Sequence, residues 1–538
     1  MSTPIDALVI GSGFGGAITA HRLAQAGRKV VLLEQGRRWS KDEFPRSIAR
    51  VANGFWQEHK SPGFLEYRVF RNMDVIQGVG VGGGSLHYFN VHIRTPAPVM
   101  KRIFPRELSR EVLDPYYDRV QARLESKPLR PPQGRDLPPR TNVFMDASRA
   151  AGHAPRMLDI AVYTGPDRHN AAGIAQSACV YCGNCLLGCH TQGKNTLDIT
   201  YIAEAERRHG LEVRPLHKVD HIAPLASGQG FAVHYRVLSD SKASTLETGV
   251  IEARNVVVAA GTLGTNEILL RSRDRTRTLP QLGPFLGQRF SGNGDFLFAG
   301  AMDVPKVVDP AFAPSITAVA DCSTAAHDIH IEDLGFPDQM MWFLEGALPP
   351  RTSYLRRIWV VLRAYLRRSL GLGVESSRLS DEIAALLDGG RTARFLPFLG
   401  MGSDAADGRM SLRDDALDLA WSHKQSREMF SQMEKAMARI ATASGGRYVS
   451  SLLWRWPLRK LLTAHPLGGC VMGETPETSV VDHRGQVWQY PGLFVTDGAC
   501  IPGALSVNPS LTIGAVAERA AFWMLHGRDM TAADPDQP

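Results

Sequence analysis

Four cysteines lie within eleven residues of one another and form the densest group of reactive side chains in the sequence: Cys179, Cys182, Cys185 and Cys189. Their spacing, with two, two and three intervening residues, is that of a bacterial ferredoxin ligand run and predicts a 4Fe–4S cluster. Four thiolates also suit zinc, and four buried free thiols are an equal alternative to the cluster. The close grouping argues against disulfides.

A glycine turn near the N-terminus has the residues that a nucleotide pyrophosphate needs. Gly11 permits a tight turn, Gly13 lets backbone N–H groups approach the phosphates, and Gly16 lets helix and strand pack closely. The helix that follows presents its N-terminus to the phosphates. Glu34 ends the next apolar run, where a carboxylate binds ribose hydroxyls. Residues 5–34 therefore predict a strand–helix–strand unit that binds a dinucleotide.

A second glycine-rich run follows at residues 77–85, where five of nine positions are glycine. So many glycines are needed where the backbone passes close to another group or takes positive φ repeatedly. A flexible loop is the alternative. Residues 86–93 come directly afterwards and are expected to form a buried strand.

Two polar side chains near the C-terminus could carry acid–base chemistry. His465 precedes Pro466 and a Gly–Gly turn, and an imidazole can accept a proton near neutral pH. Asn508 precedes Pro509 and an expected helix; its amide could stabilise a developing negative oxygen or cap that helix. A single histidine is more often structural than catalytic, so these residue types alone do not show whether His465 and Asn508 are catalytic.

The elements that must position these groups are those of a large α/β protein. A chain of 538 residues is expected to contain two or more domains. Short strands are expected at residues 211–213, 217–222, 231–237 and 251–259, an apolar strand that ends in Asp-Gly at 493–498, and a helix at 114–124. Residues 100–175, rich in Pro and Arg, are expected to wander over the surface.

Charge and hydropathy limit the partners. Lys and Arg exceed Asp and Glu by seven, but no polybasic run suggests a nucleic-acid partner. The first strand begins five residues from Met1 and no apolar run is long enough to span a membrane, so we expect a cytoplasmic protein. An arginine-rich helix with an apolar face at residues 354–366 suits peripheral contact with the inner membrane face, or packing on a neighbouring domain.

Three segments resemble the glucose–methanol–choline (GMC) oxidoreductases, and most closely their cholesterol-oxidase branch. Residues 80–86 (Gly-Val-Gly-Gly-Gly-Ser-Leu) are similar to the flavin-facing loop of that family. Residues 256–272 resemble its second signature, and residues 465–470 with 508–513 resemble its active-site segment. The matches lie at both ends and in the middle, so the resemblance covers most of the chain.

The resemblance implies an α/β fold with an FAD-binding, Rossmann-like domain and an interposed α+β substrate-binding domain. Residues 1–95, 190–300 and 463–527 would form the FAD domain, 96–189 a surface excursion with the cysteine loop, 301–462 the substrate domain and 528–538 a frayed tail. The FAD-binding residues would be Gly11, Gly13, Phe14, Gly15, Gly16, Glu34, Gly80, Gly83, Gly84, Ser85, Asn90, Val219, Asp497 and Gly498.

The resemblance also implies the chemistry. His465 would hold or deprotonate a secondary hydroxyl on a bulky apolar skeleton, a 3β-hydroxysteroid or sterol, while hydride passes to flavin N5. Asn508 would stabilise the oxygen, and Glu332 would move a proton if the steroid double bond shifts; Glu345 is the second candidate for that role. Oxygen, a quinone or an acceptor protein would take the electrons.

Three other functions remain open at this stage. The cysteine segment also occurs in long-chain alcohol oxidases, which makes a primary fatty alcohol the main rival substrate. A redox-silent lyase, in which FAD is only a scaffold, is a rival from another enzyme class. A non-enzymatic lipid carrier is a third, and His465 together with Asn508 argues against it.

Overall fold

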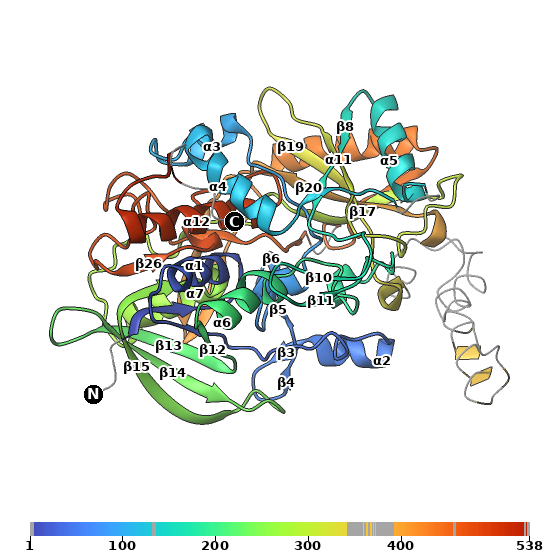
Figure 1. Cartoon of the computed structure of the whole chain (residues 1–538). Coiled ribbons are helices and arrows are strands. Elements are labelled where there is room, and N and C mark those ends of the chain that lie inside the picture. The colour runs from blue at the N-terminus through green and yellow to red at the C-terminus, as the bar shows by residue number, and fades with distance from the viewer. Residues whose placement is uncertain are drawn as a thin grey trace.

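The computed structural model describes residues 5–131, 136–341, 392–455 and 459–531, together with residues 359, 362–363, 366–367, 370, 372 and 534. Two sheets dominate this part of the chain (Figure 1), a seven-stranded one at the lower left of the view and a six-stranded one at the upper right. The catalytic candidates of the sequence lie on or beside these two sheets.

The seven-stranded sheet is assembled from three distant segments of the chain. Its strands run in the order β12 (Glu212–Arg214), β2 (Val30–Leu33), β1 (Ile5–Ile10), β15 (Thr245–Val258), β14 (Phe231–Leu238) and β13 (His217–Pro224), with β26 (Leu493–Val495) also paired to β15. β1, β2, β12, β15 and β26 are parallel, and the buried Val and Leu residues of β1 and β2 explain why helices cover this part. The strands expected at residues 211–213, 217–222, 231–237, 251–259 and 493–498 all form in this sheet.

Helices cover this sheet. α1 (Phe14–Gln25) follows β1 directly and contacts β1, β2 and the C-terminal helix α12 (Ser510–His526), which in turn contacts α4 (Arg110–Arg123). α6 (Ala203–Arg208) follows a five-residue π-helix at Asp198–Ile202. α7 (Gly261–Leu270) follows β15 and contacts β13.

The six-stranded sheet forms the wall of the second half. Its order is β23 (Arg447–Val449), β17 (Phe296–Met302), β20 (Leu396–Gly402), β19 (Ile329–Asp333), β18 (Ala318–Asp321) and β8 (Ala154–Met157), all antiparallel. α11 (Arg427–Ala443) and α5 (Pro139–Ala150) pack on it. The buried methionines Met429, Met433 and Met437 give α11 its apolar face.

Smaller sheets complete the described fold. They comprise β5 (Leu65–Val69), β6 (Met73–Gly78) and β24 (Leu461–Thr463); β16 (Gln288–Ser291), β21 (Gly408–Arg413), β22 (Ala416–Ala420) and β25 (Leu467–Gly469); and the pairs β3 (Trp56–Gln57) with β4 (Ser61–Pro62), β7 (Lys127–Pro128) with β9 (Asp159–Ile160), and β10 (Arg168–His169) with β11 (Ala175–Gln176). Two short helices, α2 (Ile48–Val51) and α3 (Ala97–Ile103), lie between these elements.

The expected surface excursion at residues 96–189 is wrong in its first half. α4 and α5 lie there, and Tyr116, Tyr117 and Phe144 on them are fully buried. The arginines that suggested a surface are partly internal, because the fully buried Arg140 pairs with Asp333 on β19. This segment belongs to the core of both halves.

The expected strand at residues 86–93 does not form. A 3-10 helix occupies Gly83–Leu86, and turns follow it. Gly80, Gly82 and Gly83 all have positive φ, so the glycine run forms successive turns. The chain that follows these turns is not an extended strand. The expected frayed tail is also anchored at its start, where Asp529 accepts from Arg519 and Trp523.

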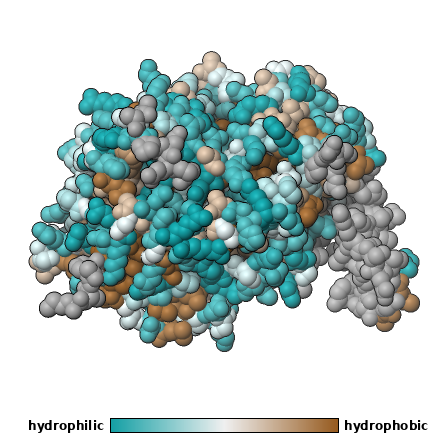
Figure 2. All heavy atoms as spheres, viewed as in Figure 1, coloured by the Kyte–Doolittle hydropathy of each residue, from teal (hydrophilic) through white to brown (hydrophobic). Residues whose placement is uncertain are grey.

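No helix among the described residues is long and apolar enough to cross a membrane. The face shown in Figure 2 is mainly hydrophilic, with scattered hydrophobic areas. Most of the helix expected at residues 354–366 lies outside the described residues; Trp359, Leu362 and Leu366 are described there and are exposed.

Candidate active site

One cavity of about 820 Å³ extends between the two halves of the protein. Its walls contain the N-terminal glycine turn, the loop after β6, and the start of α7. They also contain His465, Asn508 and side chains of the second half such as Phe298 and Leu399. The segments that the sequence singled out at both ends of the chain therefore meet at one site.

The nucleotide half of the cavity fits an FAD pyrophosphate. Gly11, Gly13 and Gly15 line it, and a Cβ atom on Gly13 would meet nothing within 4 Å, so the space in front of this backbone is open. α1 begins here at Phe14, and its N-terminus carries partial positive charge toward the phosphates. The group is accommodated without any displacement of the glycine turn.

Glu34 lies at the end of β2 and lines the same half of the cavity. Its carboxylate accepts from the backbone N–H groups of Ser12, Gly36 and Gly80, at 2.9 to 3.1 Å, and from the Ser12 hydroxyl at 2.6 Å. These bonds fix the carboxylate where the ribose of a dinucleotide is expected. They also explain the place of Gly80, whose N–H holds the acid.

Asp497 joins the opposite end of the chain to this half. It follows β26, lines the cavity and is buried, and burial raises the pKa of its carboxyl to about 6. It accepts from the Thr265 hydroxyl on α7 and from the N–H of Ala499, and through the second bond it caps the 3-10 helix Gly498–Cys500. Asp497 thus holds α7 and the turn after β26 together at the cofactor site.

The structure divides the predicted cofactor-binding residues into two groups. Those that line the cavity are Gly11, Gly13, Phe14, Gly15, Glu34, Gly83, Gly84, Val219, Asp497 and Gly498. Gly16 instead packs α1 against the backbone of Gly11, and Ser85 binds backbone groups of Gly82 and Leu197. Asn90 lines a different cavity, beside the cysteines, and Tyr88 and Phe89 face the main one in its place.

His465 faces the cavity with one ring nitrogen fixed from behind. Its Nδ1 lies 2.8 Å from Oδ1 of Asp295, which is fully buried. The other carboxylate oxygen of Asp295 accepts from the Thr463 hydroxyl at 2.9 Å and the Ala464 N–H at 3.0 Å. Because the carboxylate accepts a hydrogen bond from Nδ1–H, the proton of the neutral ring stays on Nδ1 and Nε2 is left as the acceptor toward the cavity.

Asp295 was not predicted from the sequence, and it belongs to a turn that orients both catalytic candidates. Asn293, two residues earlier, donates to the carbonyl of Val507 and accepts from the N–H groups of Leu505 and Ser506. These bonds fix the segment that leads into Asn508. An acid and an amide in Gly-Asn-Gly-Asp just before an apolar strand are the only sequence signal of this role.

Asn508 lines the cavity and is connected to Glu332 behind it. The amide nitrogen of Asn508 lies 3.4 Å from Oε2 of Glu332, and its Oδ1 is buried without a hydrogen-bond partner. The side chain does not cap α12, whose N-cap residue is Pro509. Since Glu332 takes only one of the two amide N–H hydrogens of Asn508, the second is left to donate to a substrate oxygen.

Glu332 on β19 is fully buried, and its Oε1 is also without a partner. Burial raises the pKa of this carboxyl well above its usual range, and the negative charges of Asp333 and Asp295 raise it further. The neighbouring Asp333 is committed to structure, since it accepts from Thr317 and Ala318 and pairs with Arg140. Glu345 lies outside the described residues.

The other half of the cavity is apolar. Phe298 and Phe336 stack there with ring centroids 5.7 Å apart, and aliphatic side chains surround them. The apolar lining residues come from β17, β20, β23 and the loops beside them: Leu297, Phe298, Phe336, Phe395, Leu399, Val449, Leu452 and Leu453. Such a lining suits a large hydrophobic skeleton whose one polar group reaches His465.

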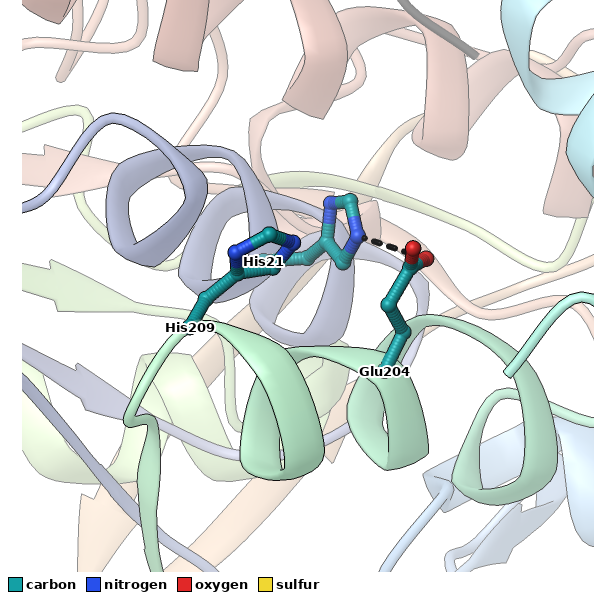
Figure 3. Close-up of side chains that lie close together, drawn as sticks. All are labelled: His21, Glu204 and His209. Atoms are coloured by element: carbon teal, nitrogen blue, oxygen red, sulfur yellow. Dashed lines mark hydrogen bonds and ion pairs between the residues drawn. The ribbon is translucent and has the colours of Figure 1, made fainter. Parts of the chain in front are cut away.

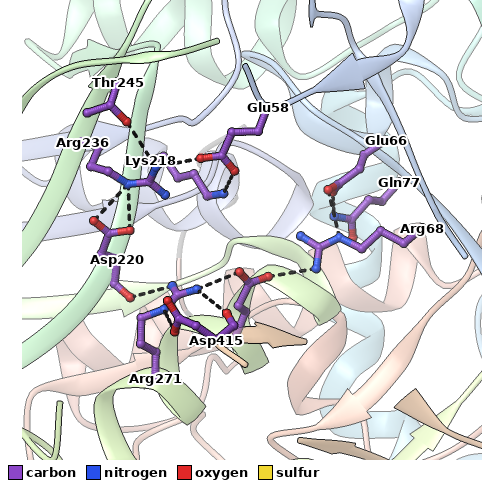
Figure 4. A network of polar contacts seen from close by, with 11 residues as sticks. Glu58, Glu66, Arg68, Gln77, Lys218, Asp220, Arg236, Thr245, Arg271 and Asp415 are labelled. Atoms are coloured by element: carbon purple, nitrogen blue, oxygen red, sulfur yellow. Dashed lines mark hydrogen bonds and ion pairs between the residues drawn. The ribbon is translucent and has the colours of Figure 1, made fainter. Parts of the chain in front are cut away.

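A network of charged side chains closes the rim of the nucleotide half (Figure 4), joining β5, β13, β14 and α7. Glu267 on α7 pairs with Arg68 and Arg271, at 2.9 Å each. Burial alone would raise the pKa of Glu267, but the charges of Arg68 and Lys218 outweigh it and lower the pKa to about 2. The network holds the walls of the cavity together.

Glu267→Gln is expected to lower the free energy of unfolding by about 3 kcal/mol at neutral pH, because the folded-state pKa is about 2 against a reference value of 4.5. Because the pKa of Glu267 is lower in the folded than in the unfolded protein, its carboxylate stabilises the fold above pH 4.5. This stabilisation is lost as the pH falls toward 2. Denaturant unfolding should therefore show the difference from wild type shrinking in that window. The exposed Glu252, changed to Gln, is the control; an equal loss there would contradict the assignment.

Three side chains elsewhere have metal-binding types but not a metal-binding environment (Figure 3). His21, Glu204 and His209 place their ligand atoms within 4.8 Å of one another. Glu204 is already paired with Arg123 and Arg208. Burial and the charges of neighbouring arginines lower the pKa of His21 to about 2, so a cation here would face the same repulsion. The group ties α1 to α6.

The four clustered cysteines are free and partly exposed, and all of them line a second, small cavity. Among the described residues only His21, Glu204 and His209 bring three ligand atoms within 4.8 Å of one another. No three of the four sulfurs are that close, so zinc has no ready ligand set here. The 4Fe–4S cluster stays a prediction.

Comparison with known proteins identifies the fold and the family. The model of the N-terminal domain of the GMC oxidoreductases matches residues 5–291, and that of the C-terminal domain matches residues 404–517. The crystal structure of pyridoxine 4-oxidase from Mesorbium loti has the same fold, with a TM-score of 0.63 and 14% identity over 98% of this chain and all of that one.

Curated relatives extend over nearly the whole sequence. A cholesterol oxidase of Acinetobacter baumannii is 28% identical over 96% of this chain and 94% of its own length. A long-chain-alcohol oxidase of Arabidopsis thaliana is 24% identical over 95% of this chain and 66% of its own length. Together with the two matched domains, these relatives confirm the predicted family and the cofactor that it uses, FAD. The chain belongs to the GMC oxidoreductase family and is an alcohol oxidoreductase.

Proposed function

We propose that this protein oxidises the 3β-hydroxyl of a steroid or sterol to a ketone. The observation that carries the proposal is the placement of His465, oriented by the buried Asp295, between the nucleotide half and the apolar half of one cavity. A hydroxyl that reaches His465 lies beside the cofactor position, while the attached carbon skeleton occupies the aromatic and aliphatic lining. The cholesterol oxidase relative supports this substrate class.

The side chains divide the work as follows. Nε2 of His465 takes the hydroxyl proton, and Asp295 stabilises the imidazolium that results. Asn508 holds the substrate oxygen and fixes the orientation of the carbinol carbon. FAD, when bound, supplies the hydride acceptor at its N5 atom. Phe298 and Phe336 exclude water and hold the skeleton.

Glu332 is proposed to move the proton when the oxidised steroid carries a double bond next to the ketone. A proton must leave the carbon between the two groups and return at the far end of the double bond, so one buried base can serve both steps. Glu332 lies behind Asn508 and is not among the residues that line the cavity, so the substrate carbon must reach its unpaired oxygen past Asn508. Its raised pKa makes it a strong base once deprotonated.

Two other functions would be distinguished by the experiment below: oxidation of a primary alcohol and a lyase reaction. A primary long-chain alcohol is favoured by the apolar lining and by the Arabidopsis relative. A redox-silent lyase would use the same cavity with FAD as a scaffold. Both would leave the geometry at His465 unchanged, so only the product separates them.

The purified holoenzyme should convert cholesterol to a 3-ketosteroid far faster than it converts 1-hexadecanol to its aldehyde, because the wide apolar half accommodates a ring system. Product identification by chromatography under matched concentrations checks this, with the 3α-epimer of cholesterol as the control. Faster conversion of 1-hexadecanol would show that a fatty alcohol, and not a sterol, is the preferred substrate. Product formation without any change in flavin absorbance would favour the lyase.

A further inference from the structure

A second small cavity, of about 20 Å³, lies inside the loop that carries the four cysteines. The sulfur-bearing residues all line it: Cys179, Cys182, Cys185 and Cys189. Tyr181, Gly183 and Gly188 have positive φ, which folds this short run back on itself so that the four side chains surround one space. A Cβ on Gly183 would collide with the Ala311 carbonyl, so this tight turn requires glycine.

The surroundings of the cysteine cavity are those of a site for an anionic, sulfur-rich group. Lys194 lines it, is buried, and forms no ion pair with a carboxylate among the described residues. Its ammonium donates to the carbonyls of Leu86, Tyr88 and Cys185. The amide of Asn90 donates to Sγ of Cys185 at 3.4 Å. The buried carboxyl of Asp198 lies near enough to interact with this ammonium, and an anionic group in the cavity would stabilise the buried cation further.

A second cation lies close to the same loop. Arg46 donates to the carbonyls of Leu187 and Gly188, which lie between Cys185 and Cys189. Like Lys194, Arg46 has no carboxylate in a salt bridge within the described part of the chain. Two cations and one amide therefore surround the four sulfurs, and each of them stabilises negative charge there.

The sulfurs, as they stand, do not converge on one metal ion. A single zinc ion draws four sulfurs to about 2.3 Å of one centre, and no three of the sulfurs converge within 4.8 Å. A cluster of several irons holds its thiolates farther apart, around an inorganic core. The spacing of the four cysteines is that of an iron–sulfur ligand run.

We propose that Cys179, Cys182, Cys185 and Cys189 hold an iron–sulfur cluster that carries electrons away from the reduced flavin. The inference rests on the proposed flavin chemistry for its role, but not for the presence of iron. It assigns the protein to the dehydrogenases, which deliver electrons to a one-electron acceptor instead of oxygen.

The position of the cysteine cavity suits that role. Leu186 and Leu187, between the third and fourth cysteines, line the main cavity on its other side. Tyr88 also lines the main cavity, and its carbonyl binds Lys194, which lines the cysteine cavity. The two cavities therefore share one wall, while the partly exposed cysteines give the other side access to solvent.

The electron balance is complete with one named co-reactant. Oxidation of each alcohol molecule places two electrons on the flavin. These electrons pass one at a time through the cluster, so two molecules of a one-electron acceptor are reduced. The protons lost by the alcohol pass to water. Ferricyanide, a small anionic one-electron acceptor, is a suitable probe.

Protein purified without oxygen should contain about four irons and acid-labile sulfide per flavin, as a four-cysteine 4Fe–4S site implies. Cys182→Ser should lose the iron while the alcohol still bleaches the flavin, and its ferricyanide reduction should fall at least ten-fold. Cys189→Ser gives the same test if the first variant does not fold. Cys322→Ser, at a buried cysteine outside the loop, is the matched control and should retain iron and rate.

Three results would overturn the inference. They are an absence of iron from the anaerobic wild-type protein, retention of iron by Cys182→Ser, and an unchanged ferricyanide rate in an iron-free variant. If iron is present but the sterol bleaches no flavin in any variant, the cluster stands and the proposed substrate fails. The two proposals are thus separated by the same set of proteins.

Discussion

His465→Ala is expected to slow reduction of the flavin by the sterol by about 10²- to 10⁴-fold, the range that general acid–base catalysis contributes. The imidazole lies at the junction of the two halves of the cavity and is held from behind by the buried carboxylate of Asp295. Its loss removes the acceptor for the hydroxyl proton but leaves the apolar lining intact. Rapid mixing without oxygen measures the reduction rate, and titration measures sterol binding.

A second variant for this prediction is Asp295→Asn. Its amide oxygen can still accept from Thr463 and Ala464, but the NH2 group then faces Nδ1 of His465 and favours the tautomer with the proton on Nε2. This variant should therefore also slow flavin reduction and shift its pH dependence, because Asp295 acts through the ring. Equal rates in wild type and His465→Ala would remove His465 from the mechanism.

Glu332→Gln is expected to abolish the shift of the steroid double bond while alcohol oxidation continues. The amide keeps the shape and the contact with Asn508 but cannot accept a proton. The product should therefore be the unconjugated ketone, which lacks the strong ultraviolet absorption of the conjugated one. Following the ketone and the conjugated product separately gives the two rates.

The pH dependence adds a second readout for Glu332. The pKa of its carboxyl is raised, so the base is protonated at low pH and becomes available only as the pH rises. Isomerisation by the wild-type protein should therefore increase with pH more steeply than oxidation does. If Glu332→Gln forms the conjugated product at the wild-type rate, another group moves the proton.

The nucleotide half of the site could be predicted from the sequence because its rules are local. Gly11, Gly13 and Glu34 lie in one strand–helix–strand unit, where spacing alone fixes which residues meet the ligand. The parallel strands β1, β2 and β15 were equally readable, since apolar runs bounded by turns predict buried strands.

The groups that orient the catalytic residues could not be predicted, because their contacts are distant in sequence. Asp295 and His465 are hydrogen-bonded but lie 170 positions apart in the sequence. The residues around either of them do not indicate this contact. The helix expected at 114–124 forms as α4, but its burial and the helix α5 were missed for another reason. Their arginines suggest a surface, and only the tertiary partner of Arg140, the buried Asp333, makes an internal arginine acceptable.

The most direct test of the account is to mix the holoenzyme with cholesterol in the absence of oxygen and record the visible absorption of the flavin. A 3β-hydroxyl held by His465 and Asn508 beside the cofactor should bleach the flavin in a single turnover and leave one 3-ketosteroid per flavin. The 3α-epimer should bleach it far more slowly, because its hydrogen points away from the cofactor. A flavin that stays oxidised with cholesterol, or bleaches equally with both epimers, would contradict the account.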